Sequence, residues 1–255
     1  HAAGAGGTAC VVSDPATIRD SLCWQSGTNS RGLGVSLSTF PGTYTVRLRN
    51  VTAVGTAFGL AFDLQGTGVN FEIDARNVIA DGGSGGAEAD VRAAASTGAS
   101  TQITMTSSNY ATEQETTGGG GVSATVTDPG TGDNQTAPPL FVNAGAGDFH
   151  QLTGSPTIDA GTTDSFAGTG DFDGDARSLE GNGVCPTAPD IGADEFIGAG
   201  PIDCDPPETT IAGGPTATTT DSTPPFALQS DEPGTTYESL IDAAAYAASP
   251  TQPTT

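Results

Sequence analysis

The chain has 255 residues, of which 37 are Gly, 17 are Pro, and only 10 are Phe, 4 Tyr and 1 Trp. Its 30 acidic and 7 basic residues, all Arg, give a net charge of −23, which disfavours binding to nucleic acid, anionic lipid or polyuronate. No apolar run reaches the length of a membrane-spanning helix. The composition fits either a disordered glycine-rich chain or a stack of short strands joined by turns, and periodicity decides between them.

The charge is unevenly distributed. Residues 1–100 carry 8 acidic and 6 basic residues, whereas residues 101–255 carry 22 acidic residues and 1 basic one. A solvated acidic surface is the simplest interpretation of the second half. Solubility at high salt and binding of divalent cations are the alternatives.

Four cysteines occur in two local pairs, and we expect the disulfides Cys10–Cys23 and Cys185–Cys204. Neither pair has zinc-finger spacing, and no His lies near enough to complete a zinc site. Two disulfides in an acidic, Lys-free chain indicate an extracellular location. The sequence opens at His1 inside an Ala/Gly run, from which we expect that an upstream part is missing.

A unit recurs through the first hundred residues: a short strand, a Gly-bearing turn, a longer strand, and a polar residue at a fixed place. Its copies are 32–54, 58–80 and 87–110, with an earlier partial copy at 16–24. In register, Asn50, Asn77 and Asn109 share one place, which Asp20 holds in the partial copy. Spacings of this size predict stacked coils. We interpret the aligned Asn residues as a structural hydrogen-bonded ladder along the stack, with a binding role as the alternative.

Each long strand alternates with period two. One face is expected to be buried (Tyr44, Val46, Leu48 and Val69, Phe71, Ile73, Ala75), and the other solvated (Thr45, Arg47, Arg49 and Asn70, Glu72, Asp74, Arg76). No segment sustains a 3.6-residue period, so helices should be scarce. Strands that cannot bury an apolar face alone gain a core by stacking, and a parallel β-helix follows.

The repeat pattern ends at about residue 118, and the composition changes there. Residues 118–142 read as one strand followed by turns and an extended Pro-rich segment, and 201–210 as a Pro/Asp/Thr linker. Between them stand three motifs, DFHQLTGSPTIDAG (148–161), DFDGDARS (171–178) and PDIGADEF (189–196). Residues 206–255 hold short alternating strands separated by turns.

The three motifs resemble the terminal coil and closing segment of bacterial right-handed parallel β-helix repeat proteins, many of them secreted or surface-anchored in actinobacteria. RNVTAV (49–54) and RNVIADGG (76–83) fit the same group, so the resemblance covers roughly residues 10–196. It implies an all-β, right-handed parallel β-helix over residues 1–200 at the cell surface or outside the cell. The motifs are fairly specific for this architecture but carry almost no information on activity.

Residues 206–255 resemble the first half of a bacterial immunoglobulin-like repeat. That family often carries a Cys pair near its middle, and Ser239 and Ser249 stand in the corresponding neighbourhood here. We therefore expect a linker at 201–210 and a partial immunoglobulin-like module at 211–255. Further sequence or another chain would complete its sandwich.

Because polysaccharide lyases and hydrolases also use this architecture, the polar residues need testing for catalysis. Lyases of this kind resemble one another in using Arg or Lys bases, but Lys is absent and Arg49 and Arg76 read as repeat features. Hydrolases need a carboxylate pair, for which Asp63, Asp74 and Asp90 are the candidates. We expect no catalytic residues, and we expect His150, the only internal His, to make a structural hydrogen bond rather than act as a base.

One motif contains carboxylates that could bind a metal ion. Asp171, Asp173 and Asp175 alternate around Gly174, and carboxylates in such a turn can converge on calcium. The alternative is an acidic turn whose carboxylates accept backbone N–H groups.

These features together predict a non-catalytic, extracellular structural or adhesive protein. Its expected partners are copies of itself, in an oligomer or a filament joined through open β-edges, or the cell surface and its glycans. The alternative is a carbohydrate-binding or polysaccharide-degrading β-helix. No cofactor is expected apart from calcium.

Overall fold

In the computed structural model, the described residues are 5–13, 15–35, 40–83, 87–130, 133–179, 181–182, 187–198, 206–232, 235–239 and 247–249. The chain divides into two compact units, His1–Ile202 and Asp203–Thr255. Strands make up nearly all the regular structure, and the one helical element among the described residues is a 3-10 turn, Ala144–Ala146. None of the described helical structure is long and apolar enough to cross a membrane. The predicted all-β class is confirmed.

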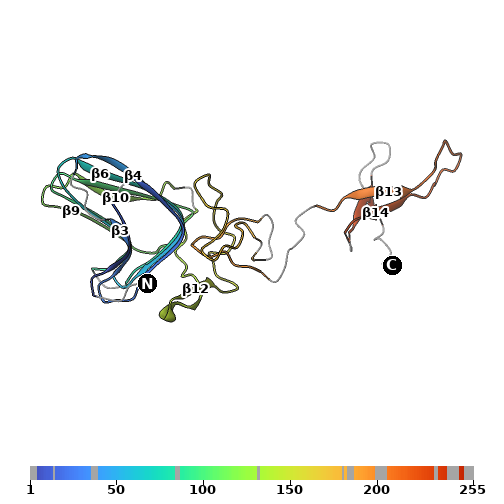
Figure 1. The fold of residues 1–255 in the computed structure, drawn as a ribbon. Helices are drawn as coiled ribbons and strands as arrows, with labels where there is room; N and C mark the ends of the chain where they lie inside the picture. The colour runs from blue at the N-terminus through green and yellow to red at the C-terminus, as the bar shows by residue number, and fades with distance from the viewer. Residues whose placement is uncertain are drawn as a thin grey trace. The chain divides into compact units, whose positions relative to one another are not determined.

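The first ten strands of unit 1 build a parallel β-solenoid (Figure 1). The odd-numbered strands form one parallel sheet in the order β1-β3-β5-β7-β9, and the even-numbered strands form a second in the order β10-β8-β6-β4-β2. Their bounds are β1 Thr8–Val12, β2 Ala16–Gln25, β3 Arg31–Val35, β4 Gly42–Gly55, β5 Phe58–Gln65, β6 Val69–Asp81, β7 Ala89–Ser96, β8 Ser100–Thr106, β9 Glu113–Gly118 and β10 Ser123–Thr127.

Alternating side chains fill the space between the two sheets. In β4, Val46 and Leu48 are fully buried, and in β6 the predicted inward residues Phe71 and Ile73 are buried as well. Tyr44 stacks on Phe71 one coil later, with ring centroids 5.2 Å apart. The apolar residues of successive coils therefore form one continuous core, which single strands of this length could not form alone.

One corner of the solenoid carries a column of residues in the left-handed conformation. Asp20, Asn50, Asn77 and Ser107 have φ values of 48°, 52°, 53° and 44°. Asn and Asp adopt this conformation more readily than other non-Gly residues. Nδ2 of Asn77 donates to Oδ1 of Asn50 at 2.8 Å, and Nδ2 of Asn50 donates to Oδ1 of Asp20 at 3.1 Å.

Asn109 does not stand in that column. Arg76 pairs with Thr106, so the position after Asn77 falls to Ser107, and Asn109 instead pairs with Ile79. Its amide donates to the carbonyl of Ala137 at 2.7 Å. The polar column therefore runs through Ser107, and Asn109 ties the solenoid to the segment that follows it.

After β10, the chain turns back along the same corner of the solenoid. This segment contains β11 (Phe141–Asn143) and β12 (Asp148–Gln151), which pair antiparallel, and then continues without long strands. Its contacts reach several coils: Arg177 pairs with Asp20 at 3.2 Å, the N–H of Ala193 donates to Oγ1 of Thr52 at 2.9 Å, and Asp164 pairs with Arg49 at 3.1 Å. We call residues 140–198 the strap.

The strap explains why Arg49 departs from the sequence pattern. Alternation places this residue on the solvated face, yet its side chain is only 2% exposed. Asp164 of the strap and Asp74 of the next coil both pair with its guanidinium, and Phe166 lies over it at 5.8 Å from the ring centroid. The charge is therefore neutralised where the strap covers it.

The disulfide Cys10–Cys23 joins β1 to β2 with an S–S distance of 2.00 Å, as predicted. Cys185 and Cys204 lie outside the described residues. Unit 2 contains two small antiparallel pairs, β13 (Thr209–Gly213) with β14 (Ala227–Ser230), and β15 (Tyr237–Ser239) with β16 (Ala247–Ser249). The strand content of unit 2 is thus established, and the immunoglobulin-like assignment remains a prediction.

Candidate functional site

The closing motif 189–196 is held by its own buried carboxylates. Asp190 is fully buried and accepts hydrogen bonds from the N–H groups of Asp159 and Phe196, both at 2.7 Å. Glu195 accepts from the N–H groups of Leu179 and Asp190, both at 2.9 Å. Burial, followed by the nearby charge of Glu195, raises the pKa of Asp190 to about 8. The acidic residues of this motif therefore organise irregular backbone that has no strand partners.

The DFDGD turn uses its first carboxylate in the same way. Oδ1 of Asp171 accepts the N–H groups of Asp173, Gly174 and Asp175 at 2.8–2.9 Å, and Oδ2 accepts the N–H of Glu195 at 3.1 Å. Four backbone donors occupy this carboxylate. Among the described residues, the side-chain oxygens of the three aspartates are not grouped within 4.8 Å of one another, and calcium binding by this turn stays a prediction.

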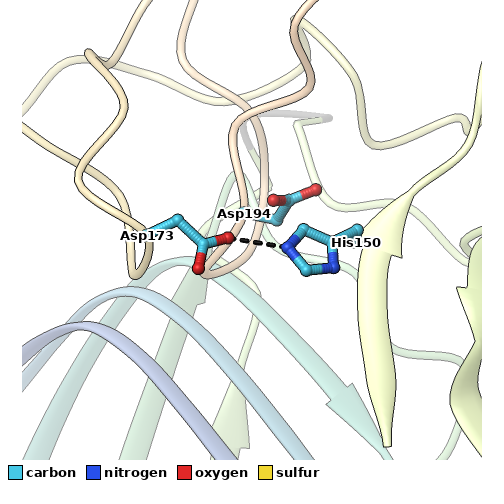
Figure 2. Close-up of side chains that lie close together, drawn as sticks. All are labelled: His150, Asp173 and Asp194. Atoms are coloured by element: carbon cyan, nitrogen blue, oxygen red, sulfur yellow. Dashed lines mark hydrogen bonds and ion pairs between the residues drawn. The ribbon is translucent and has the colours of Figure 1, made fainter.

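The turn instead directs Asp173 toward a histidine. His150 projects from β12, Asp173 from the DFDGD turn and Asp194 from the closing motif, and their side chains meet on the strap (Figure 2). Nε2 of His150 lies 2.7 Å from Oδ2 of Asp173, and Nδ1 lies 2.6 Å from Oδ1 of Asp148. Phe172 flanks the imidazole with ring centroids 5.2 Å apart. We call His150, Asp173 and Asp194 the histidine cluster.

The members of the histidine cluster differ in exposure. The side chains of His150 and Asp173 are 48% and 44% exposed, whereas Asp194 is 6% exposed. The pKa of His150 is raised to about 9, chiefly by its hydrogen bond to Asp148 and further by Asp173 and Asp194. Burial raises the pKa of Asp194, and Asp171 and Asp173 raise it further. At neutral pH, His150 therefore holds a proton on both nitrogens, which disfavours a role as a general base.

The three carboxylates predicted as hydrolase candidates all have structural partners. Asp63 lies between Arg31 and Arg92, at 2.5 and 2.7 Å, and Asp74 pairs with Arg49 at 2.6 Å. Asp90 accepts the N–H groups of Gly82, Ala111 and Thr112. Asp63 and Asp74 lie on one coil and Asp90 on the next, and each carboxylate binds groups of a neighbouring coil.

A pocket of about 460 Å³ opens where the last coils meet the strap. Its wall combines the carboxylates of Asp81 and Asp90 with the rings of Tyr110 and Phe141, and the remaining lining residues are Ala80, Gly82, Gly83, Asn109, Ala111, Thr112, Thr136, Pro138, Pro139 and Ala144. Burial, and then Asp90, raises the pKa of Asp81, while burial and Glu113 raise that of Tyr110.

Sequence reasoning did not find the pocket or the histidine cluster, because the members of each come from separate segments that no single motif contains. The only local signal was the unusual density of Asp in the strap. Searches against protein-family models, curated proteins and solved structures found no match for this chain. The fold and the sites therefore rest on the residues themselves.

Proposed function

We propose that this chain is a secreted, non-catalytic structural or adhesive protein built on a right-handed parallel β-helix. The observation that carries the proposal is the use of the charged residues on the solenoid. Asp63, Asp74 and Asp90, the acids that the sequence offers as candidates for a catalytic pair, each hold adjacent coils together. Charged side chains that pair with neighbouring coils favour a rigid structural role over catalysis.

Two further features support the extracellular and surface parts of the proposal. The disulfide Cys10–Cys23 is of the kind that persists in oxidising surroundings. The resemblance of the strap motifs to secreted β-helix proteins, and of residues 206–255 to an immunoglobulin-like repeat, points to a surface protein that carries a second module. Localisation of a tagged full-length protein, by protease accessibility on intact cells, tests this assignment; complete protection from protease would contradict it.

A direct test separates the structural role from catalysis. The variants Asp63→Asn and Asp74→Asn should lower the melting temperature by a few degrees, because each breaks an ion pair between coils. Neither should alter any glycan-directed activity. Turnover of a polysaccharide by the wild-type chain that either substitution abolishes would overturn the proposal.

Self-association is the proposed mode of assembly. β9 is the last strand of its sheet and β10 the last of the other, so both present an edge, and nearly all of β9 is exposed. Edges of this kind pair with other chains unless charge blocks them. We expect oligomers or filaments by light scattering and electron microscopy. Thr116→Lys in β9 should reduce them, and Thr163→Lys, an exposed control in the strap, should not. Monodisperse monomers would contradict this part.

Glycan binding is the second candidate function, and the pocket beside Tyr110 favours it. Aromatic faces next to carboxylate acceptors suit the apolar faces and hydroxyl groups of sugars. Binding of the full chain to a glycan array, lost in Tyr110→Ala and retained in Asp63→Asn, would support this function. An array without any bound glycan would leave the structural proposal as the only one.

A further inference from the structure

Three segments of the strap bring one imidazole nitrogen and two carboxylates to a single point. The ligand atoms of His150, Asp173 and Asp194 all lie within 4.8 Å of one another. A central ion would need bonds of about 2.0–2.2 Å to nitrogen and oxygen ligands, so the 2.7 Å contact between His150 and Asp173 must widen as the side chains move around the ion. His150 and Asp173, both about half exposed, have the freedom to do so.

The imidazole is already oriented as a metal ligand. Oδ1 of Asp148 lies 2.6 Å from Nδ1 of His150, which fixes a proton on that nitrogen and directs Nε2 toward Asp173 and Asp194 (Figure 2). A carboxylate behind the ligating histidine is the usual arrangement in zinc sites, where it sets the tautomer and raises the basicity of the ligand.

Asp194 supplies the buried member of the set. One of its oxygens, Oδ2, accepts the N–H of Gln151 at 2.6 Å, and the other accepts no hydrogen bond from any described residue. The residue is only 6% exposed, so this bond and its burial hold the Asp194 carboxylate in place beside the other two members of the cluster. Figure 2 shows the Asp194 carboxylate beside the imidazole of His150 and the carboxylate of Asp173.

The negative charge around this point also favours a bound cation. Asp148, Asp173 and Asp194 surround one imidazole, with Asp173 and Asp148 within 2.7 Å of its nitrogens. Arg177, the only Arg or Lys in the strap sequence, directs its guanidinium to Asp20, Glu195 and backbone carbonyls. A divalent ion in place of the proton on Nε2 would balance the carboxylates.

We propose that the histidine cluster is a binding site for a divalent transition-metal ion of the zinc type. The ion would be coordinated by Nε2 of His150 and one oxygen each of Asp173 and Asp194, with water completing the shell. An imidazole ligand favours zinc-type ions over calcium, which takes oxygen ligands. On binding, the bond between His150 and Asp173 opens and the proton on Nε2 passes to solvent, so the ion joins β12, the DFDGD turn and the closing motif.

The test uses the full chain freed of metal and titrated with zinc chloride by calorimetry, with cobalt chloride added in parallel for its visible absorption. We expect one zinc ion per chain and a melting temperature that rises with zinc concentration, because the ion binds the folded state. His150→Gln and Asp173→Asn, both at half-exposed positions, should keep the fold and weaken binding more than 10-fold. Asp148→Asn should weaken it about 10-fold through the lost orientation of the ring.

Two controls make the result decisive. His1→Ala removes the only other histidine of the chain and should leave zinc affinity unchanged. Calcium chloride should raise the melting temperature less than zinc does at the same concentration. Zinc affinity that is equal in the wild type and in His150→Gln, or that disappears in His1→Ala, would overturn the site. Calcium stabilisation as large as that of zinc would overturn the assigned class of ion.

Discussion

Asn77 donates a hydrogen bond from its side-chain amide to the side-chain oxygen of Asn50, one coil earlier, at 2.8 Å. The same amide also donates to the carbonyl of Thr162, and its own oxygen accepts the N–H of Thr162 at 2.9 Å. One buried asparagine thus links two coils to each other and both to the strap. Its backbone is left-handed, so the residue satisfies a conformational and a hydrogen-bonding requirement together.

The first prediction concerns that residue. Asn77→Ala leaves buried partners without hydrogen bonds and places Ala at a positive φ, so it should lower the free energy of unfolding by about 3–5 kcal/mol. Asn29→Ala is the matched control, since Asn29 has a φ of 55° but is exposed; we expect a loss of about 1 kcal/mol there. Urea unfolding measures both, and equal losses would show that the ladder contributes nothing beyond the backbone conformation.

The second prediction concerns the close approach of successive coils at Gly59. A Cβ at this position would lie 2.5 Å from the backbone nitrogen of Asp81 and 2.8 Å from the carbonyl of Ala53, and neither atom can move without breaking strand pairing. Gly59→Ala should therefore cost about 3 kcal/mol or prevent folding. Gly118→Ala, with no heavy atom within 4 Å of the added carbon, should change stability by less than about 0.5 kcal/mol. Circular dichroism melts compare the two, and similar melting temperatures would contradict the packing argument.

The third prediction concerns the disulfide. Cys10 and Cys23 are separated by 13 residues, and closing a loop of this size should stabilise the fold by about 3 kcal/mol through the unfolded state. The double variant Cys10→Ser/Cys23→Ser should show this loss in urea unfolding. Because reducing agent also acts on Cys185 and Cys204, the double variant in oxidising buffer isolates the described bridge. Unchanged stability would mean that the unfolded chain gains little freedom when the bridge is absent.

The fourth prediction is a dependence of stability on pH. Burial raises the pKa of Asp190 to about 8, above the 3.8 of an ordinary aspartate, so between these values the folded state holds a proton that the unfolded state has lost. The free energy of unfolding should therefore fall as pH rises from about 4 to 8, and this contribution is level outside that window. Asp190→Asn should be less stable at every pH yet flatten the slope. Asp133→Asn, an exposed substitution with the same change of charge, should not flatten it; equal slopes in both variants would refute the assignment.

Much of the solenoid could be predicted because its signal is local and repeated. Alternation over Val69, Phe71 and Ile73 identified the buried face correctly, and the glycine turns located the strand ends. Each coil meets nearly the same surroundings as its neighbour, so one repeat supports the interpretation of the next. The repeats also led to one wrong prediction, which placed Asn109 in register with Asn50 and Asn77. Matching Asn to Asn shifted the last copy by two residues, whereas strand pairing places Ser107 at the corner.

The strap was predictable as a segment but not as an arrangement. Nothing in the sequence pairs Arg49 with Asp164, or His150 with Asp173 and Asp194, because these contacts join positions without a shared period. The density of Asp suggested calcium in the DFDGD turn. Four backbone N–H groups bind the Asp171 carboxylate, and the sequence could not reveal the one from Glu195, which only the path of the chain brings there; calcium binding in the turn stays a prediction.

The return of the strap to the first coils also sets an order of events during synthesis. The hydrogen bond from Ala193 to Thr52 spans 141 residues, and Arg177 reaches back to Asp20. A chain that emerges amino end first can stack its coils as they appear, but the corner along Asn50 and Asn77 stays uncovered until the strap residues that contact it, such as Thr162 and Ala193, have been made. The first coils are therefore the last to gain their contacts with the strap. Until then, they are the most accessible to proteases and to coils of other nascent chains.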